Sequence, residues 1–156
     1  MTYDEIYARL KEKLPAAVID APKTHGEPYL LVKPELIADV CRFLRDEPSL
    51  AFDYPSCISG LDNGKEMWVV YHLRSIKQNH CAVLKAPVDR ANPRLPTVMP
   101  VWRGADWHER ETFDMYGIRF EGHPDLRRIL LPEDWPGYPL RKDYEFPEEY
   151  QGIPLK

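Results

Sequence analysis

The spacing of apolar residues predicts two helices in the first third of the chain. Apolar side chains recur every three or four positions over residues 3–14, after a capping-box pair formed by Thr2 and Glu5. A second stripe with the same period lies between Pro34, which suits the first position of a helix, and Pro48, which ends it.

Runs of β-branched and aromatic residues predict five strands around these helices. The segment 67–73 is apolar on both faces, which is typical of a strand inside a sheet. Turns are expected at 24–28 and at Asn63-Gly64, a pair that favours a tight hairpin. The strands are expected at residues 17–21, 29–32, 50–58 with an interruption at Pro55, 67–73 and 80–86. The order helix, two strands, helix, three strands predicts an α+β fold with helices covering a mixed sheet.

The chain changes character after residue 86. Prolines in the segment 87–100 predict a linker or surface loop, in which Thr97 could cap a short helix. A short helix is then expected from near Asp106 to Gly117. We therefore predict an α+β domain over residues 1–118 and an extended arm over residues 119–156.

The predicted arm combines frequent prolines with many large apolar residues. Six prolines between Glu121 and the C-terminus exclude a long helix, yet the segment also carries Trp135, Tyr138, Tyr144 and Phe146. A disordered tail is one interpretation, but disordered segments are normally poor in aromatic residues. An extended arm that becomes ordered on the groove of a partner protein fits this composition better.

The short helix has bulky and charged side chains on every side. Trp107, Phe113 and Tyr116 project in different directions, and acidic and basic residues lie between them. Covered charges need partners. We expect this helix to lie between the core of its own domain and something else, where its charges are hydrogen-bonded. The alternative is a short amphipathic helix with partly exposed aromatic residues.

Composition and motifs exclude several classes of function. The formal net charge of −4 argues against a nucleic-acid-binding protein, and no apolar run is long enough for a membrane span or a signal peptide. The three cysteines form no CxxC pair, and no phosphate-binding glycine motif is present. His108, Glu109 and Glu111 do not converge on one helix face, so a small enzyme using them is the weakest hypothesis.

Two segments resemble the signature of a known family. They are WHERETFDMYGI, residues 107–118, and HPDLRRILLPEDWPGYPLRKDY, residues 123–144. NPRLPTV, residues 92–98, and VVYHL, residues 69–73, are similar to it as well. The family is the 30-kDa subunit of respiratory complex I, which includes the bacterial C subunit and the chloroplast J subunit.

The resemblance implies a structural subunit of a proton-pumping NADH:quinone oxidoreductase. Members of the family bind no cofactor, dock on the D subunit near the quinone site and lie close to the B and I subunits. Iron–sulfur clusters, FMN, quinone and NADH belong to the assembled complex, and the isolated chain is expected to be inactive. The implied location is peripheral, on the cytoplasmic side of the bacterial inner membrane. A related subunit of a membrane-bound nickel–iron hydrogenase is the alternative.

Docking of this kind predicts an interface on the short helix and the arm. Aromatic anchors and charged residues that pair across the boundary are the expected contributors. They are Trp107, Glu109, Arg110, Glu111, Phe113, Tyr116, Arg128, Trp135, Tyr138, Arg141 and Tyr144.

Overall fold

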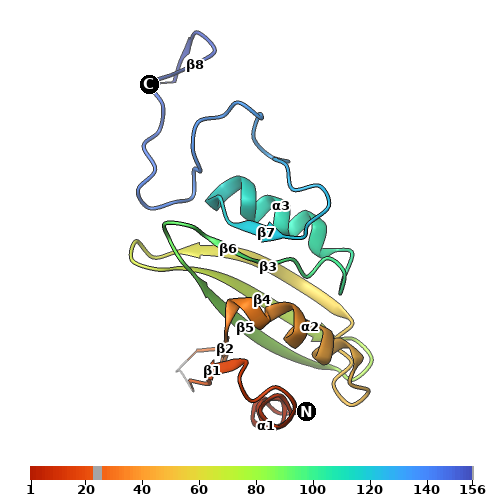
Figure 1. Ribbon diagram of the computed structural model, residues 1–156. Coiled ribbons are helices and arrows are strands. Elements are labelled where there is room, and N and C mark those ends of the chain that lie inside the picture. The colour runs from red at the N-terminus through yellow and green to blue at the C-terminus, as the bar shows by residue number, and fades with distance from the viewer. Residues whose placement is uncertain (23–25, 156) are drawn as a thin grey trace.

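The computed structural model describes residues 1–22 and 26–155 (Figure 1). Its helices are α1 (Tyr3–Lys13), α2 (Ile37–Asp46) after a 3-10 turn η1 (Pro34–Leu36), and α3 (Ala105–Tyr116). Thr2 and Glu5 form the predicted capping box. Gly117 ends α3 with a φ of 72°, a left-handed conformation that glycine adopts without strain. The turn predicted at 24–28 includes residues that lie outside the described part.

The central sheet is mixed, which confirms the predicted fold class. It contains β1 (Val18–Asp20), β2 (Leu30–Val32), β3 (Tyr54–Asp62), β4 (Met67–Ser75) and β5 (His80–Val88). Their order is β1-β2-β5-β4-β3, in which only β2 and β5 are parallel. β4 therefore lies inside the sheet, as its two apolar faces predicted.

The predicted strand at 50–58 was misplaced. β3 begins only at Tyr54, because Ala51 takes a φ of 44° and the amide of Phe52 donates to the Leu44 carbonyl at the end of α2. Pro55 fits within β3 because this edge strand pairs only with β4 and its register shifts there.

The prediction of a linker over 87–100 was also wrong. β5 continues to Val88, and β6 (Arg94–Pro96) pairs in parallel with β7 (Arg119–Glu121). Leu95 and Phe120, which face each other in this pair, are buried in the core. The division of the chain at residue 118 stays a prediction, but the first three residues beyond it belong to this small second sheet.

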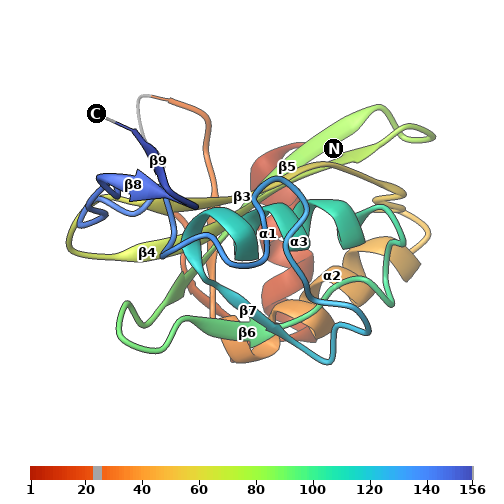
Figure 2. The same ribbon diagram turned by 90° about the horizontal axis from the view of Figure 1, so that it is seen from above.

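The core lies on one face of the central sheet. Met67, Val69, Tyr71 and Leu73 of β4 are fully buried there, under α1 and α2. α3 packs over the β3 side of the sheet, next to β6 and β7 (Figure 2).

The arm runs along α3 and then leaves the body. Its end forms a small hairpin of β8 (Glu149–Tyr150) and β9 (Ile153–Pro154). Figure 1 shows this hairpin well separated from the central sheet, at the opposite end of the molecule from α1.

Candidate docking surface

Helix α3 lies between the sheet and the arm. On the sheet side, the Tyr116 ring fills the space that a side chain at Gly60 would occupy, 2.4 Å from an ideal Cβ. On the arm side, the rings of Phe113 and Tyr138 meet edge to face at 6.3 Å, and the Leu140 amide donates to the Met115 carbonyl at 3.1 Å. The helix is covered on two sides, but the second cover is the arm of its own chain.

Asp114 is the strongest link between α3 and the arm. Its buried Oδ2 accepts the backbone amides of Ile129, Leu130 and Leu131 at 2.8–3.1 Å, and its Oδ1 accepts from Arg128 at 2.8 Å. Burial alone would raise the pKa of Asp114, but these donors hold it below its usual value. The carboxylate therefore remains charged and fixes the arm where it crosses the helix.

Asp62 makes a second link, at the end of β3. Its carboxylate accepts the backbone amides of Lys142 and Gly64, both at 2.8 Å, and pairs with Arg90. Arg90 also pairs with Asp143 at 2.8 Å. Burial opposes the charge on Asp62, yet these donors lower its pKa. This role of Asp62 was not predicted, because in the sequence the residue stands out only by its place next to the turn at Asn63-Gly64.

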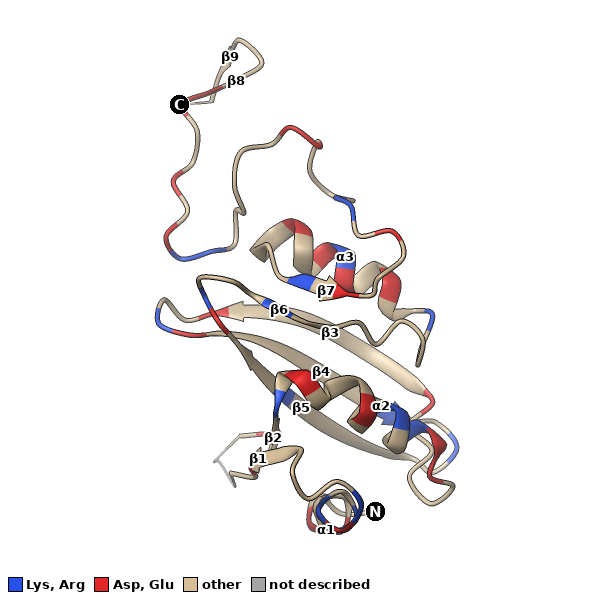
Figure 3. Cartoon of the chain, in the orientation of Figure 1, with Lys and Arg blue, Asp and Glu red and all other residues tan. Residues whose placement is uncertain are grey.

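The arginines of the predicted interface are also engaged within the chain. Arg128 donates to the carbonyls of Trp135 and Gly137 in addition to Asp114. Arg141 donates to the Tyr116 carbonyl at 2.6 Å and lies over the Tyr138 ring. Arg110 donates to the Arg127 carbonyl and lies over the exposed Trp107 ring. Figure 3 shows both signs of charge along α3 and the segment facing it.

Glu109 has no exposed surface and so no area to offer a partner in this structure. Its carboxylate accepts the Thr97 hydroxyl at 2.5 Å and the Val98 amide at 2.7 Å. Burial raises the pKa of Glu109 to about 7, against the lowering effect of these two donors. Thr97 therefore anchors β6 to α3. The sequence had suggested that Thr97 caps a short helix, and this suggestion was wrong.

The buried His123 ring adds to this cluster at the start of the arm. Its Nε2 lies 3.2 Å from Asp106 Oδ1 and 3.9 Å from Glu109 Oε2. Its Nδ1 accepts the Asp125 amide at 3.1 Å, which leaves Nε2 facing the two carboxyl groups.

Four aromatic residues of the arm, Trp135, Tyr144, Phe146 and Tyr150, contact one another in a cluster of their own. Trp135 packs against Tyr150 with ring centroids 4.9 Å apart and against Phe146 at 6.0 Å. The Trp135 indole donates to the Tyr144 hydroxyl at 3.0 Å, and the Tyr150 hydroxyl donates to Asp134 at 2.6 Å.

The charges of α3 have hydrogen-bonding partners within this chain. The partners of Glu109, Arg110 and Asp114 described above all belong to this chain. Trp107, at 62% exposure, and Glu111 remain at the surface, and Glu109 and Arg110 are buried. The other residues of the predicted interface are half-buried. The membership of this interface stays a prediction.

The described residues do not assemble a metal or acid–base site at His108, Glu109 and Glu111. The His108 Nδ1 lies 3.5 Å from the Ile58 amide, Glu109 is buried against Thr97, and Glu111 is exposed. No group of three potential metal ligands occurs among the described residues, and none of their helices is long and apolar enough to cross a membrane.

Comparison with known proteins gives a consistent match. Residues 30–150 match the family model described as the 30-kDa subunit of respiratory-chain NADH dehydrogenase. The NADH-quinone oxidoreductase C subunit of Roseiflexus sp. (strain RS-1) is 48% identical over 141 residues, which cover 88% of this chain and 81% of the relative. The corresponding C subunit of Chlorobium phaeobacteroides is 42% identical over 151 residues, covering 94% and 91%.

Two solved structures have a similar fold. A chain in the structure of the membrane-bound sulfane sulfur reductase, an archaeal respiratory membrane complex, gives a TM-score of 0.73 at 28% identity, covering 91% of this chain and 85% of that one. The trypsin-resistant fragment of Nqo5 gives a TM-score of 0.61 at 28% identity, covering 78% of this chain and 99% of the fragment.

Proposed function

Because the chain belongs to the 30-kDa subunit family of respiratory-chain NADH dehydrogenase, we propose that it is a structural subunit of an NADH-quinone oxidoreductase. It holds other subunits together and contributes no catalytic group. Its expected neighbours are the family's D, B and I subunits, of which the D subunit is the main docking partner. The iron–sulfur clusters, FMN and the quinone site lie in those and other subunits, and the chain is peripheral, on the cytoplasmic side.

One observation carries this proposal. The arm is fixed to the body by two charged carboxylates, Asp114 and Asp62, and it leaves apolar side chains exposed. Leu130, Leu140, Phe146 and Ile153 are each at least half exposed, and Trp107 lies uncovered on α3. Exposed apolar groups on an ordered surface are typical of a protein–protein contact.

Trp107 provides the cleanest test. Its ring is exposed, whereas Trp135 supports the arm's own aromatic cluster, so loss of Trp107 will affect docking more than folding. If it is a buried anchor in the complex, Trp107→Ala will weaken docking by about 2–4 kcal/mol. The matched control is Ile76→Ala, which removes a side chain of 67% exposure from the turn between β4 and β5.

The measurement is the amount of partner subunits that a tagged chain retains during purification from membranes. We expect Ile76→Ala to match the wild type and Trp107→Ala to lose most of its partners. Equal retention by both variants would remove Trp107 from the interface.

A related respiratory complex is the second candidate. The likeness to a chain of the sulfane sulfur reductase complex favours it, since that fold match covers nearly the whole chain. The nickel–iron hydrogenase remains a hypothesis based on the family resemblance. Identification of the proteins that purify with the tagged chain separates these complexes, because it shows directly which other subunits accompany the chain.

A further inference from the structure

A cluster of three titratable side chains joins the start of the arm to α3. Asp106 and Glu109 lie about one helical turn apart on α3, so they are neighbours on its surface. The ring of His123, just after β7, lies against both, with Nε2 3.2 Å from Asp106 Oδ1 and 3.9 Å from Glu109 Oε2. The side chains of Glu109 and His123 have no exposed surface. These three residues are called the junction cluster below.

Two atoms of the junction cluster are buried without a hydrogen bond. Among the described residues, neither Asp106 Oδ1 nor His123 Nε2 has a hydrogen-bonding partner, although the two atoms face each other. The Glu109 carboxyl is beyond hydrogen-bonding distance of the ring, and it accepts from Thr97 and Val98 instead. Unpaired buried polar atoms weaken this closed arrangement, which makes it sensitive to the charge that the cluster carries.

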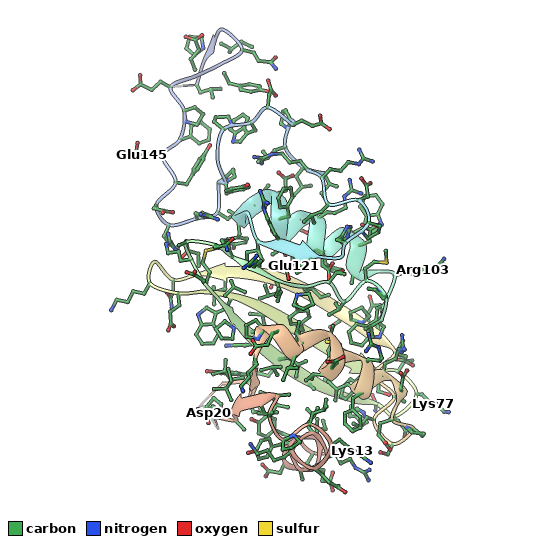
Figure 4. The ribbon with its side chains drawn as sticks, viewed as in Figure 1. Lys13, Asp20, Lys77, Arg103, Glu121 and Glu145 are labelled. Carbon is green, nitrogen blue, oxygen red and sulfur yellow. The ribbon has the colours of Figure 1, made fainter. Side chains whose placement is uncertain are left out.

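The arginines around the junction cluster are paired with other groups. Arg110 donates to the Arg127 carbonyl, and Arg127 pairs with Asp125 at the surface. Arg94 pairs with Glu121, which ends β7 beside α3 and is labelled in Figure 4. Within the described part of the chain, the contact with His123 is the only ion pair open to the Glu109 carboxylate.

The titratable side chains that face Glu109 from the core are neutral. Cys41 of α2 and Tyr71 of β4 are fully buried, and burial raises the pKa of both. Burial also raises the pKa of Glu109 to about 7, against its hydrogen bonds and with a further contribution from the Asp106 carboxyl. Glu109 therefore binds a proton more tightly in the closed cluster than it would in water.

We propose that the junction cluster is a proton-operated latch, which fastens the start of the arm to α3 while Glu109 holds a proton and loosens when that proton passes to water. Loss of the proton leaves two carboxylates close together on α3, one of them fully buried, and like charges repel strongly in such surroundings. Movement of His123 away from α3 would admit water to both carboxylates and relieve this repulsion. The latch lies within one chain and does not depend on the proposed function.

The direction of the pH dependence follows from the raised pKa of Glu109. Because the closed state binds the proton more tightly than the open state, protonation favours closure. Opening should be least at pH 4.5 and below, the ordinary pKa of the carboxyl group, should increase with pH, and should level off above about pH 7.

Hydrogen exchange in the full chain tests the latch. The amides of Val98 and Asp125 report on it, since they donate to Glu109 and His123. After correction for the intrinsic pH dependence of exchange, their opening should increase about a hundredfold between pH 4.5 and 7, while amides of β4 stay protected. Glu109→Gln should keep the opening near its low value at every pH. The control Glu111→Gln, at an exposed position of α3, should follow the wild type.

Carbon-13 NMR of the Glu109 carboxyl group measures the proton itself. Its signal should titrate over the same pH interval as the two amides, and Asp106→Asn should move both to lower pH, because it removes a like charge.

Three results would each overturn the proposal. They are amide opening that does not vary with pH, a carboxyl signal that titrates over a different interval from the amides, and a Glu109→Gln profile equal to that of Glu111→Gln. If Glu109→Gln fails to fold, the comparison of carboxyl and amides in the wild type still decides the question.

Discussion

Replacing Asp114 by Asn should release the arm from helix α3. The wild-type carboxylate accepts three consecutive backbone amides and one arginine N–H, and its side chain is fully buried. Asparagine keeps one acceptor oxygen of similar shape but removes the charge. Arg128, whose side chain is only 12% exposed, then loses its buried counter-charge.

The size of the effect follows from these contacts. Removing one member of a buried ion pair costs about 3–5 kcal/mol, and asparagine recovers part of this through its remaining oxygen. A loss of about 3 kcal/mol in the free energy that holds the arm closed corresponds to roughly a hundredfold change in the opening equilibrium. Because Leu126 of the arm and Tyr116 of α3 also pack against the core, the body itself should stay folded.

Hydrogen exchange of individual amides measures this opening. In Asp114→Asn, the amides of Ile129, Leu130 and Leu131 should exchange about a hundred times faster, while amides of β4 remain as protected as in the wild type. Asp125→Asn is the control, because it removes an exposed carboxylate of the same arm that pairs only with Arg127 among the contacts described. Unchanged exchange at the three amides in Asp114→Asn would refute the account of the arm.

Acid should have the same effect as the substitution. The folded pKa of Asp114 lies below its ordinary value of 3.8, so its contribution is complete above pH 3.8 and is lost as the pH falls through the lowered pKa. In the wild type, the arm amides should therefore lose their protection from hydrogen exchange in strong acid. In Asp114→Asn, the protection of the same amides should depend less on pH.

Three further substitutions test the surroundings of α3. The pKa of Glu109 is raised from 4.5 to about 7, so the free energy of unfolding of the wild type should fall by roughly 3 kcal/mol as the pH rises from 4.5 to 7. Glu109→Gln should remove this pH dependence, which urea unfolding at several pH values measures. Gly117→Ala should cost at least about 1–2 kcal/mol in thermal unfolding, because its φ is positive and a Cβ would lie 2.5 Å from the Tyr138 ring, whereas Gly104→Ala, with open space, should be nearly neutral. Asp62→Asn should lower the free energy of unfolding measured in urea by about 2–3 kcal/mol. A stability equal to that of the wild type would show that the groups donating to Asp62 find other acceptors.

The fold was largely predictable from local patterns. The capping box at Thr2, the stop at Gly117 and the two apolar faces of β4 are all encoded within a few neighbouring residues. β6 and β7 were missed because their pairing joins Leu95 to Phe120, across a whole helix, and three-residue strands leave almost no periodic signal.

The site was predictable only in outline. The sequence indicated that α3 would be covered on two sides, but the residues that hold the arm depend on distant contacts. Asp62 meets Lys142 eighty positions away, and nothing near either residue in sequence indicates this contact. Glu109 is a charged residue on the helix that was predicted to form the interface. It is nevertheless buried, because Thr97 and Val98 donate hydrogen bonds to its carboxylate.

Purification of the native complex through a tag on α1, far from the arm, shows whether this chain is a subunit that holds an oxidoreductase together. Quinone oxidoreductase subunits, including the family's D subunit, should purify with the wild-type chain in fixed proportion, and Trp107→Ala should lose them. A chain that purifies alone from membranes and lysate, with its arm amides already fully protected, would contradict this expectation.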